Sequence, residues 1–390
     1  MKKLFLILTL AFASYIVDAQ TINLVKDNSY AITEDSDFFD ALGQAGTLYN
    51  AKKLTVFDDG TAMISHTNEN RYSLFDKNGK HLKDIEIYFE DGKKKPFNLQ
   101  PVFGKINNLY FTGNNSQGII YFFNDNGLIV KDITIDFSSH EMIPLANNKI
   151  ALFGGTSWTK QWRYFVAILD VNTEKYHIIY DDFEDSTFPK NDYTIYAKRL
   201  INHRIDMIKI SDNVLAIAIP DNGKLLLYNF IESNLIEKKL DWKPKTLSVE
   251  EQQKMQSEAI EKYKKEFPNW SSDDMDPQTI AELQQEFVQR LENGMNYITE
   301  PLTLSWFTSA MKGNGDNIIF FEYIEEAGKN SFHTYSVNQN KTISQNSFQS
   351  ADFDLSITKN RFVIHNGYVY GIQKVKGSEN ELRLVRFEMK

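Results

Sequence analysis

The sequence predicts an all-β fold, a six-bladed β-propeller with one inserted α-helical hairpin. Three observations support this prediction: a hairpin pattern that recurs after 48 residues, six turn signals at blade-sized spacing, and a final unit that lacks one strand. The predicted propeller domain covers residues 20–390, and the helical hairpin covers residues 247–295. Repeated four-stranded units of about 40 to 50 residues are typical of propellers.

The hairpin pattern is most visible in two segments that match in register. Residues 73–87 have the sequence SLFDKNGKHLKDIEI and residues 121–135 have YFFNDNGLIVKDITI, so that Phe, Asn-Gly, Lys-Asp-Ile and a second Ile coincide. An Asn-Gly pair between β-branched or aromatic runs predicts a tight hairpin, because this turn needs positive φ angles. The repeat therefore predicts equivalent hairpins in successive blades.

A second kind of turn separates two apolar runs upstream of each hairpin. It occurs at residues 58–60, 107–108, 147–148, 212–213, 316–317 and 366–367. Measured between the last residues of these turns, the spacings are 48, 40, 65, 104 and 50, and the longest interval contains the helical insertion. Six turns predict six blades, and seven blades are the alternative.

The last unit contains only three predicted strands, around residues 361–364, 368–373 and 382–387. We expect residues 21–25, with the sequence TINLV, to supply the fourth strand. This pairing would join the two ends of the chain and remove an exposed sheet edge.

In its repeat spacing the chain resembles the six-bladed propellers of the NHL and TolB-like kind, which occur in exported bacterial proteins. The resemblance covers the whole mature chain, but the Tyr-Trp-Thr-Asp signature of one six-bladed group is absent. It implies a fold and does not identify a ligand, because propellers serve as scaffolds, receptors and enzymes alike.

The N-terminal residues 1–19 have the composition of a signal peptide. A short basic start precedes an apolar run over residues 4–17, and small residues end at Ala19. Cleavage there would make Gln20 the mature N-terminus. The apolar run is shorter than the roughly 18 to 20 residues that a membrane helix needs, and no later stretch reaches that length. We expect a periplasmic or secreted protein without stable membrane insertion.

Cysteine content and charge restrict the chemistry. The chain has no cysteine, which excludes disulfides, a thiol nucleophile and cysteine metal ligands. Its net charge is −9, and loss of the signal peptide makes it −10. The longest basic cluster is residues 93–95, so an acidic surface of this kind excludes nucleic acid as an expected partner.

The segment 247–295 changes from strand-like to helical patterning. Ser248 and Glu251 form a capping box for a first helix that ends before Pro268. Asp276 and Pro277 are suited to start a second helix as N-cap and first helical residue. Its apolar stripe has two interpretations: packing on the adjacent blade, or a cap or partner-docking element over the propeller mouth.

Loop length predicts which face of the propeller carries the site. The helical hairpin and residues 27–50, 155–163 and 184–204 map to one face, whereas turns such as 78–79 and 126–127 on the other face are short. Binding residues are concentrated on loops that a rigid scaffold positions. We therefore expect the long-loop face to bind the ligand.

Polar residues just before each innermost strand are expected to surround the mouth of the central channel. They are Asn98, Gln100, His140, Glu141, His203, Arg204, Asp352 and Asp354. Histidines and carboxylates from several blades could bind a metal, an anion or a sugar; the alternative is that each is a turn or edge residue satisfied locally.

The segment 158–164 contains two tryptophans followed by a cationic side chain. Trp158 and Trp162 offer flat apolar surfaces that suit sugar rings or a protein partner, and Arg163 follows them. The alternative is structural, with Trp162 packed under its own hairpin and Trp158 covering the rim. Trp306, in a predicted innermost strand, is expected to be core.

Two hypotheses of function follow. The favoured one is a non-catalytic exported propeller, without a cofactor, that binds a protein or glycan through its long-loop face; its oligomeric state is left open. The alternative is a metal-dependent hydrolase or lyase at the channel mouth. Lactonase propellers hold a divalent metal with acidic residues and Asn, and Glu141, Asp352 and Asn98 could take these roles, although no motif matches them. Motifs of standard hydrolases and nucleotide enzymes are absent from the sequence.

Overall fold

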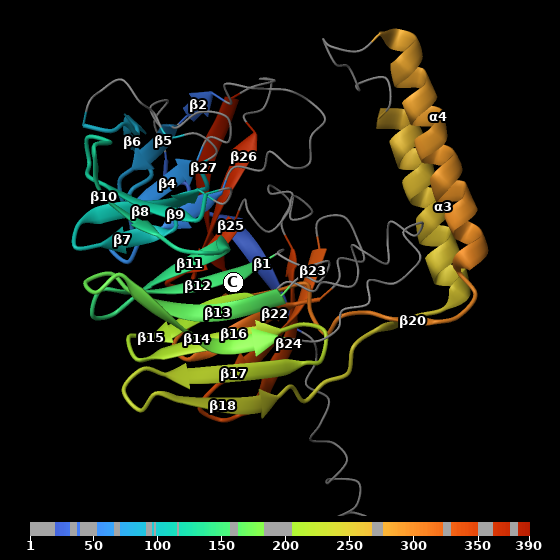
Figure 1. Ribbon diagram of the computed structural model, residues 1–390. Coiled ribbons are helices and arrows are strands. Elements are labelled where there is room, and N and C mark those ends of the chain that lie inside the picture. The colour runs from blue at the N-terminus through green and yellow to red at the C-terminus, as the bar shows by residue number, and fades with distance from the viewer. Residues whose placement is uncertain are drawn as a thin grey trace, which may run out of the picture.

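A computed structural model describes most of residues 20–390. The described residues are 20–31, 37–39, 53–65, 71–90, 96, 99–114, 117–156, 163–182, 205–266, 276–322, 329–349, 362–374 and 381–390. The predicted signal peptide, residues 1–19, lies outside them. Most described residues belong to strands, which form a series of small antiparallel sheets (Figure 1).

Four sheets each contain four strands that are consecutive in the chain. The first two are β3 (Leu54–Val56), β4 (Ala62–Ser65), β5 (Arg71–Phe75) and β6 (His81–Glu86), and β7 (Gly104–Ile106), β8 (Leu109–Asn114), β9 (Ile119–Phe123) and β10 (Ile129–Thr134). The next two are β11 (Ser138–Leu145), β12 (Lys149–Thr156), β13 (Arg163–Asp170) and β14 (Lys175–Asp182), and β15 (Asp206–Ser211), β16 (Val214–Ile219), β17 (Lys224–Asn229) and β18 (Asn234–Lys239).

A larger sheet contains two similar units joined through the N-terminal strand. One unit is β21 (Ser309–Lys312), β22 (Asn317–Phe321), β23 (Lys329–Ser336) and β24 (Lys341–Gln349). The other is β25 (Phe362–His365), β26 (Tyr368–Lys374) and β27 (Glu381–Met389), to which β1 (Gln20–Lys26) and β2 (Asp37–Phe39) are added.

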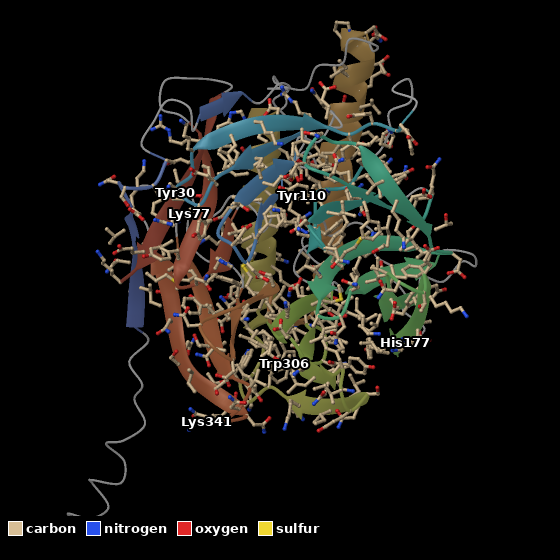
Figure 2. All side chains as sticks on the ribbon, turned by 90° about the vertical axis from the view of Figure 1, so that its left-hand side faces the viewer. Tyr30, Lys77, Tyr110, His177, Trp306 and Lys341 are labelled. Atoms are coloured by element: carbon tan, nitrogen blue, oxygen red, sulfur yellow. The ribbon has the colours of Figure 1, made fainter. Side chains whose placement is uncertain are left out.

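The sheets are arranged around a common centre. The first strands of successive units contact one another, in the pairs β7–β11, β11–β15, β15–β21, β21–β25 and β25–β3. Figure 2 shows the sheets following one another in chain order around this centre. Such blade-like four-stranded units around an axis are characteristic of a β-propeller.

The two ends of the sheets differ because the strands alternate in direction. Connections after the first and third strands lie at one end, which we call the turn face, and those after the second and fourth lie at the other, the long-connection face. All six turns marked in the sequence lie between a first and a second strand, hence on the turn face. Positive φ angles at Asn108, Asn148 and Gly367 show how tightly the chain reverses there.

The N-terminal strand has the position that the sequence predicts. Leu24 pairs with Met389 in an antiparallel ladder, so β1 adds a fourth strand to β25–β27. Its first half also pairs in parallel with β24, where Gln20 is opposite Asn346. This second pairing was not predicted, because the hydrophobic pattern of a strand carries no information about a partner so far away in sequence.

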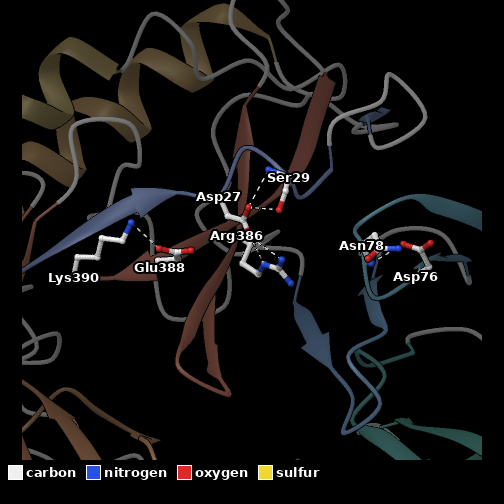
Figure 3. Close-up of polar contacts among 7 residues, drawn as sticks. All are labelled: Asp27, Ser29, Asp76, Asn78, Arg386, Glu388 and Lys390. Atoms are coloured by element: carbon white, nitrogen blue, oxygen red, sulfur yellow. Dashed lines mark hydrogen bonds and ion pairs between the residues drawn. The ribbon is translucent and has the colours of Figure 1, made fainter.

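A largely buried ion pair holds the segment after β1 on the last sheet (Figure 3). Arg386 donates from Nε and Nη2 to Oδ2 of Asp27 at 2.9 and 2.6 Å, and its guanidinium lies 4.4 Å from the centroid of the Tyr30 ring. Burial alone would raise the pKa of Asp27, but hydrogen bonds from Ser29 and Arg386 outweigh it and lower the pKa. The carboxylate therefore stays ionised.

The same segment also contacts the first sheet. The backbone N–H of Ala31 donates to the carbonyl of Asn78 at 2.9 Å. Gly79, at φ +80°, lies so close to Tyr30 that a Cβ would be 2.7 Å from its ring. Residues 27–31 thus connect the last sheet to the turn between β5 and β6 of the first.

The Lys-Asp-Ile repeat has a structural role between sheets. Lys83 on β6 donates to the carbonyl of Asp125 at 2.6 Å, and Lys131 on β10 donates to that of Val171 at 2.7 Å. Each lysine therefore holds a turn of the following sheet, while the isoleucine two residues later is 2% exposed in both copies. The repeated Lys-Asp-Ile sequence therefore forms part of a hairpin and also supplies the lysine that contacts the next sheet.

Two helices interrupt the chain between β18 and β21. They are α3 (Val249–Glu266) and α4 (Pro277–Gly294), followed by a short 3₁₀ turn (Met295–Tyr297), and they are attached through the two-residue strands β19 (Thr246–Leu247) and β20 (Leu302–Thr303). In Figure 1 the helices run side by side and project away from the sheets. They leave from the long-connection face.

The helix starts predicted from the sequence are confirmed. Ser248 donates its backbone N–H to Glu251 Oε2 at 2.7 Å, and the Ser248 hydroxyl accepts from the Glu251 N–H at 3.1 Å. Asp276 caps α4 by accepting from the N–H groups of Gln278 and Thr279. These bonds satisfy donors that have no partner within the helix.

The apolar stripes of α3 and α4 meet each other. The rings of Tyr263 and Phe287 are 5.2 Å apart, and Gln256 donates across the pair to the carbonyl of Leu291 at 3.0 Å. Ile260 and Leu291 are buried, whereas Leu283 remains 46% exposed. Within the described residues, part of the predicted stripe therefore stays accessible to solvent.

We predict that Arg386→Met destabilises the protein by about 3 kcal/mol, because it leaves the Asp27 carboxylate largely buried without its cation. Urea denaturation measures the free energy of unfolding. Asp27→Asn combined with Arg386→Met is expected to recover part of the loss, because it removes the unpaired charge. A loss below about 0.5 kcal/mol for the single variant would show that the ion pair does not hold the N-terminal segment.

We predict that Gly127→Ala costs more stability than Gly60→Ala. Both glycines have φ above +80°, so both alanines carry a strain of about 1 to 2 kcal/mol. Only at Gly127 would the new Cβ meet backbone, 1.8 Å from the carbonyl oxygen of Glu86; at Gly60 the nearest atom is 3.4 Å away. Thermal unfolding measures both losses of stability. Equal losses for the two variants would show that the close approach of Gly127 to the Glu86 carbonyl does not add to the cost of the alanine.

Candidate functional site

A cavity of about 630 Å³ occupies the centre of the ring of sheets. Residues of β11, β15, β21 and β25 and of the β3 region form its wall. Backbone and side chains of first strands are therefore what a ligand in the centre would contact. This is the common position for a cavity in a ring of sheets, where the first strands leave a channel.

One end of the cavity, toward the long-connection face, is acidic. Asp206, the first residue of β15, is 7% exposed and accepts the N–H of Ala310 at 2.7 Å through Oδ2. This bond joins the first strands of two neighbouring units. Glu141 lies on the same wall. Ionised carboxylates accept hydrogen bonds, so this end can receive a donor group of a ligand.

The opposite end, at the turn face, carries two lysines. Lys209 forms an ion pair of 3.0 Å with Asp212, and Lys312 from the neighbouring strand lines the same opening. Hydrogen bonding to Lys209 and then its charge lower the pKa of Asp212, and the charge of Lys312 adds to this effect. Asp212 is thus paired with Lys209, and Lys312 acts on it only through its charge.

His365 and Asn366 complete the turn-face opening. The amide nitrogen of Asn366 lies 3.0 Å from His365 Nε2, and the imidazole is partly buried. Burial lowers the pKa of His365; Asp58 opposes this shift and Lys312 reinforces it. We expect the imidazole to be neutral at pH 7, able to both donate and accept a hydrogen bond.

The structure places three of the predicted channel-mouth residues. Glu141 lines the cavity. His140 is exposed at a β-bulge between Ser139 and Glu141, with its ring 6.1 Å from that of Phe153. Gln100 is half-buried, and its carbonyl accepts hydrogen bonds from Tyr72 and Thr112. Glu141 alone among these three is brought to the cavity.

Most of the other predicted site residues lie outside the residues that the structure describes. Arg163 begins β13, where its backbone pairs with Thr156. The remaining predicted residues lie outside the described ranges: Asn98, Trp158, Trp162, His203, Arg204, Asp352 and Asp354. Their roles stay predictions.

Sequence reasoning missed the residues of the turn-face opening. Lys209, Lys312 and His365 lie at or next to the ends of first strands, close to turns that were marked only as repeat signals. A signal was available, because a charged residue at the end of an innermost strand must lie near the channel. The predicted site residues precede the first strands, on the long-loop face, and therefore do not include these positions at the opposite end.

Two described tryptophans have packing roles. Trp306 contacts Gly223 so closely that a Cβ there would be 2.3 Å from the indole. It lies in a bend before β21, not within the predicted innermost strand, and it is a partly buried side chain packed against the hydrophobic core. Trp242 stacks on His333 with ring centroids 4.4 Å apart. Trp242 lies between β18 and β19, and Trp306 lies between β20 and β21, so these contacts hold the two chain segments that flank the helical insertion.

Two negative findings apply to the described part of the chain. It contains no group of three or more His, Asp or Glu side chains that could hold a metal ion. None of its helices combines the length and apolar character that crossing a membrane requires.

Taken together, the blade-like sheets around a central cavity define a β-propeller protein. No family model matches the sequence, and no curated protein is significantly similar to it. Among solved structures, a member of the DUF4221 family from Bacteroides vulgatus is similar over 96% of this chain and 99% of its own, with 10% identity and a TM-score of 0.50.

Two further solved structures are similar at a lower level. A Bacteroides fragilis protein inferred to be exported has 10% identity and a TM-score of 0.47 over 96% of both chains. Virginiamycin B lyase from Staphylococcus aureus has 13% identity and a TM-score of 0.41 over 86% of this chain and 80% of the lyase. At such identities the likeness concerns the fold alone.

We predict that His365 makes stability sensitive to acid. Because its pKa is lowered in the folded state, the unfolded chain takes up a proton first, and stability falls as the pH drops through about 6.5. The Tm of the wild type should decrease by roughly 2 °C more than that of His365→Gln between pH 7.5 and about 5.5. His140→Gln is the control for loss of an exposed histidine; parallel curves for all three proteins would refute the prediction.

Proposed function

We propose that this protein is an exported, non-catalytic six-bladed β-propeller that binds a protein or glycan partner through its long-connection face. The six blades comprise the four separate four-stranded sheets and the two units that β1 joins, with β1 as the outermost strand of the last blade. The segment with α3 and α4 is a helical-hairpin insertion. The signal-peptide composition of residues 1–19 supports export.

The difference between the two faces is the observation that carries this proposal. On the turn face, every described connection is a short reversal, such as residues 107–108, 147–148 and 366–367. On the other face, the chain between β14 and β15 and the chain between β18 and β21 are far longer, and the latter includes both helices. Long connections on a rigid scaffold are the usual location of binding residues.

We propose that Trp158 and Trp162 contribute to this face, because in the sequence they fall between β12 and β13, the second and third strands of a sheet. Indole rings provide large contact area at a low cost in side-chain entropy, whether the partner is a sugar ring or a protein surface. We propose these two residues, with Arg163, as principal contacts. We propose the same for His203, Arg204, Asp352 and Asp354, because they precede first strands in the sequence.

We predict that the double variant Trp158→Ala/Trp162→Ala weakens partner binding at least tenfold while the fold is retained, since aromatic anchors commonly dominate such interfaces. A glycan array and a panel of purified cell-envelope proteins identify the ligand, and surface plasmon resonance gives its Kd. Ile231→Ala is the matched control, because Ile231 is 74% exposed in a turn on the opposite face. Unchanged binding by the double variant, or equal loss in the control, would contradict the proposal.

A further inference from the structure

The lysines and the histidine of the turn-face opening come from three neighbouring first strands. Lys209, Lys312 and His365 lie at or near the ends of β15, β21 and β25 and line the cavity. The first strands β7 and β11 end instead with Ile106 and Leu145, which are apolar and buried. The first strands thus bring cationic and imidazole groups to one side of the opening.

The two lysines lie at a similar level of the cavity. The hydrogen bond of 2.7 Å from the Ala310 N–H to Asp206 aligns β15 with β21, and both strands run toward the turn face. Lys209 follows Asp206 by three residues, and Lys312 follows Ala310 by two. Because a strand rises about 3.3 Å per residue, both lysines are roughly 7 to 10 Å beyond this bond, at the same end of the cavity.

The charge of Lys312 acts on groups of both neighbouring units. Its strand, β21, contacts β15 on one side and β25 on the other. Hydrogen bonding to Lys209 and its charge lower the pKa of Asp212, and the charge of Lys312 lowers this pKa further. Burial lowers the pKa of His365, and Lys312 again adds to the shift. The Lys312 ammonium therefore lies near groups from both adjacent strands.

Lys312 is the cation that a ligand can contact directly. Among the residues that the structure describes, it has no ion-pair partner. Lys209 is paired with Asp212, but the Lys209 side chain is 26% exposed and that of Asp212 is 77% exposed, so the carboxylate lies toward solvent. Asp58 is likewise exposed at the rim. An anion can thus bind Lys312 and share Lys209 with Asp212.

Asn366 and His365 add neutral hydrogen-bonding groups to the lysines. The amide nitrogen of Asn366 lies 3.0 Å from His365 Nε2. An amide nitrogen only donates, so Nε2 of the neutral imidazole accepts and Nδ1 carries the proton. The second amide hydrogen of Asn366 is left for another acceptor. Donors from separate strands suit an anion whose oxygens point in several directions, as those of a phosphate group do.

Apolar side chains line the cavity beyond the lysines. Met311 and Val363 are half-buried and contribute to its wall. Thioether and aliphatic groups accept a small apolar group without requiring hydrogen bonds. The volume of about 630 Å³ is in the range of small-molecule sites. A ligand with an anionic group at the opening and an apolar group in the cavity matches these surfaces.

We propose that the turn-face opening binds a small phosphate monoester, with its phosphate at Lys312 and Lys209 and its organic group in the cavity. A phosphate monoester carries a charge of about −1.5 to −2 at pH 7, which two ammonium groups can balance. A carboxylate carries less charge, and its two oxygens lie in one plane with its carbon. This site lies on the face opposite the proposed partner surface and is independent of it.

The test is isothermal titration of the full mature protein with phenyl phosphate, inorganic phosphate and benzoate at low ionic strength, where charges are least screened. We expect phenyl phosphate to bind with a Kd of about 1 mM or below. Inorganic phosphate lacks the apolar group and benzoate lacks part of the charge, so each should bind about fivefold or more weakly. No binding of phenyl phosphate, or equal affinity of either other anion, would overturn the proposal.

Two variants with opposite expected effects test the charges. Lys312→Met should weaken phenyl phosphate by about tenfold or more, because it removes the directly contacted cation. Asp212→Asn should strengthen binding by about threefold, because it removes the carboxylate that shares Lys209; a misfolded variant could not bind more tightly. Lys341→Met, an exposed lysine on β24, is the control for loss of one charge. Unchanged affinity in Lys312→Met, or no gain in Asp212→Asn, would contradict the proposal.

The imidazole of His365 reports where the anion binds. A bound phosphate opposes the charge of Lys312 and should raise the pKa of His365, as the nearby carboxylates Asp58 and Asp59 do in the free protein. NMR titration between about pH 5 and 8, with and without phenyl phosphate, measures this change, and His365→Gln assigns the resonance. An unchanged pKa would exclude binding at this opening. Trp158→Ala/Trp162→Ala should bind phenyl phosphate normally; loss of binding there would place the ligand on the partner surface instead.

Discussion

Closure of the ring by the N-terminal strand is the constraint on which the rest of the structure depends. Each sheet buries one face against the next, so the first and last sheets must meet for every face to be covered. The strand β1 pairs with both β24 and β27, and the contacts of Asp27, Tyr30 and Ala31 extend the closure to the first sheet. Backbone pairing satisfies the hydrogen-bonding groups at the strand edges, and the largely buried ion pair with Arg386 attaches Asp27 to β27.

The closed ring explains why the two faces differ in character. On the turn face, glycines such as Gly79 and Gly127 serve twice: they allow positive φ, and they let a turn approach the neighbouring element too closely for a side chain. Lys83 and Lys131 then attach turns of adjacent sheets. These contacts constrain the turn face in the units that they join.

The sequence predicted the elements better than it predicted the site. Hairpins, turns and helix caps depend on neighbours along the chain, so Asn-Gly pairs and the caps at Ser248 and Asp276 were recognisable. The cavity depends on residues from β15, β21, β25 and the β3 region that meet only in the ring. Of the predicted channel-mouth residues that the structure describes, Glu141 lies on the cavity wall, while Lys209, Lys312 and His365 were not singled out.

By itself, the sequence determined the local structure: where strands begin and end, which turns need positive φ, and that the N-terminal strand completes the last unit. Tertiary structure alone decided the parallel pairing of β1 with β24, the ion pair between Asp27 and Arg386, and the separation of Asp206 from the lysines across the cavity. The physical reason is the separation along the chain between the residues that interact. Local signals arise from backbone dihedral angles and side-chain periodicity, whereas charges that meet in the centre come from strands far apart in the chain.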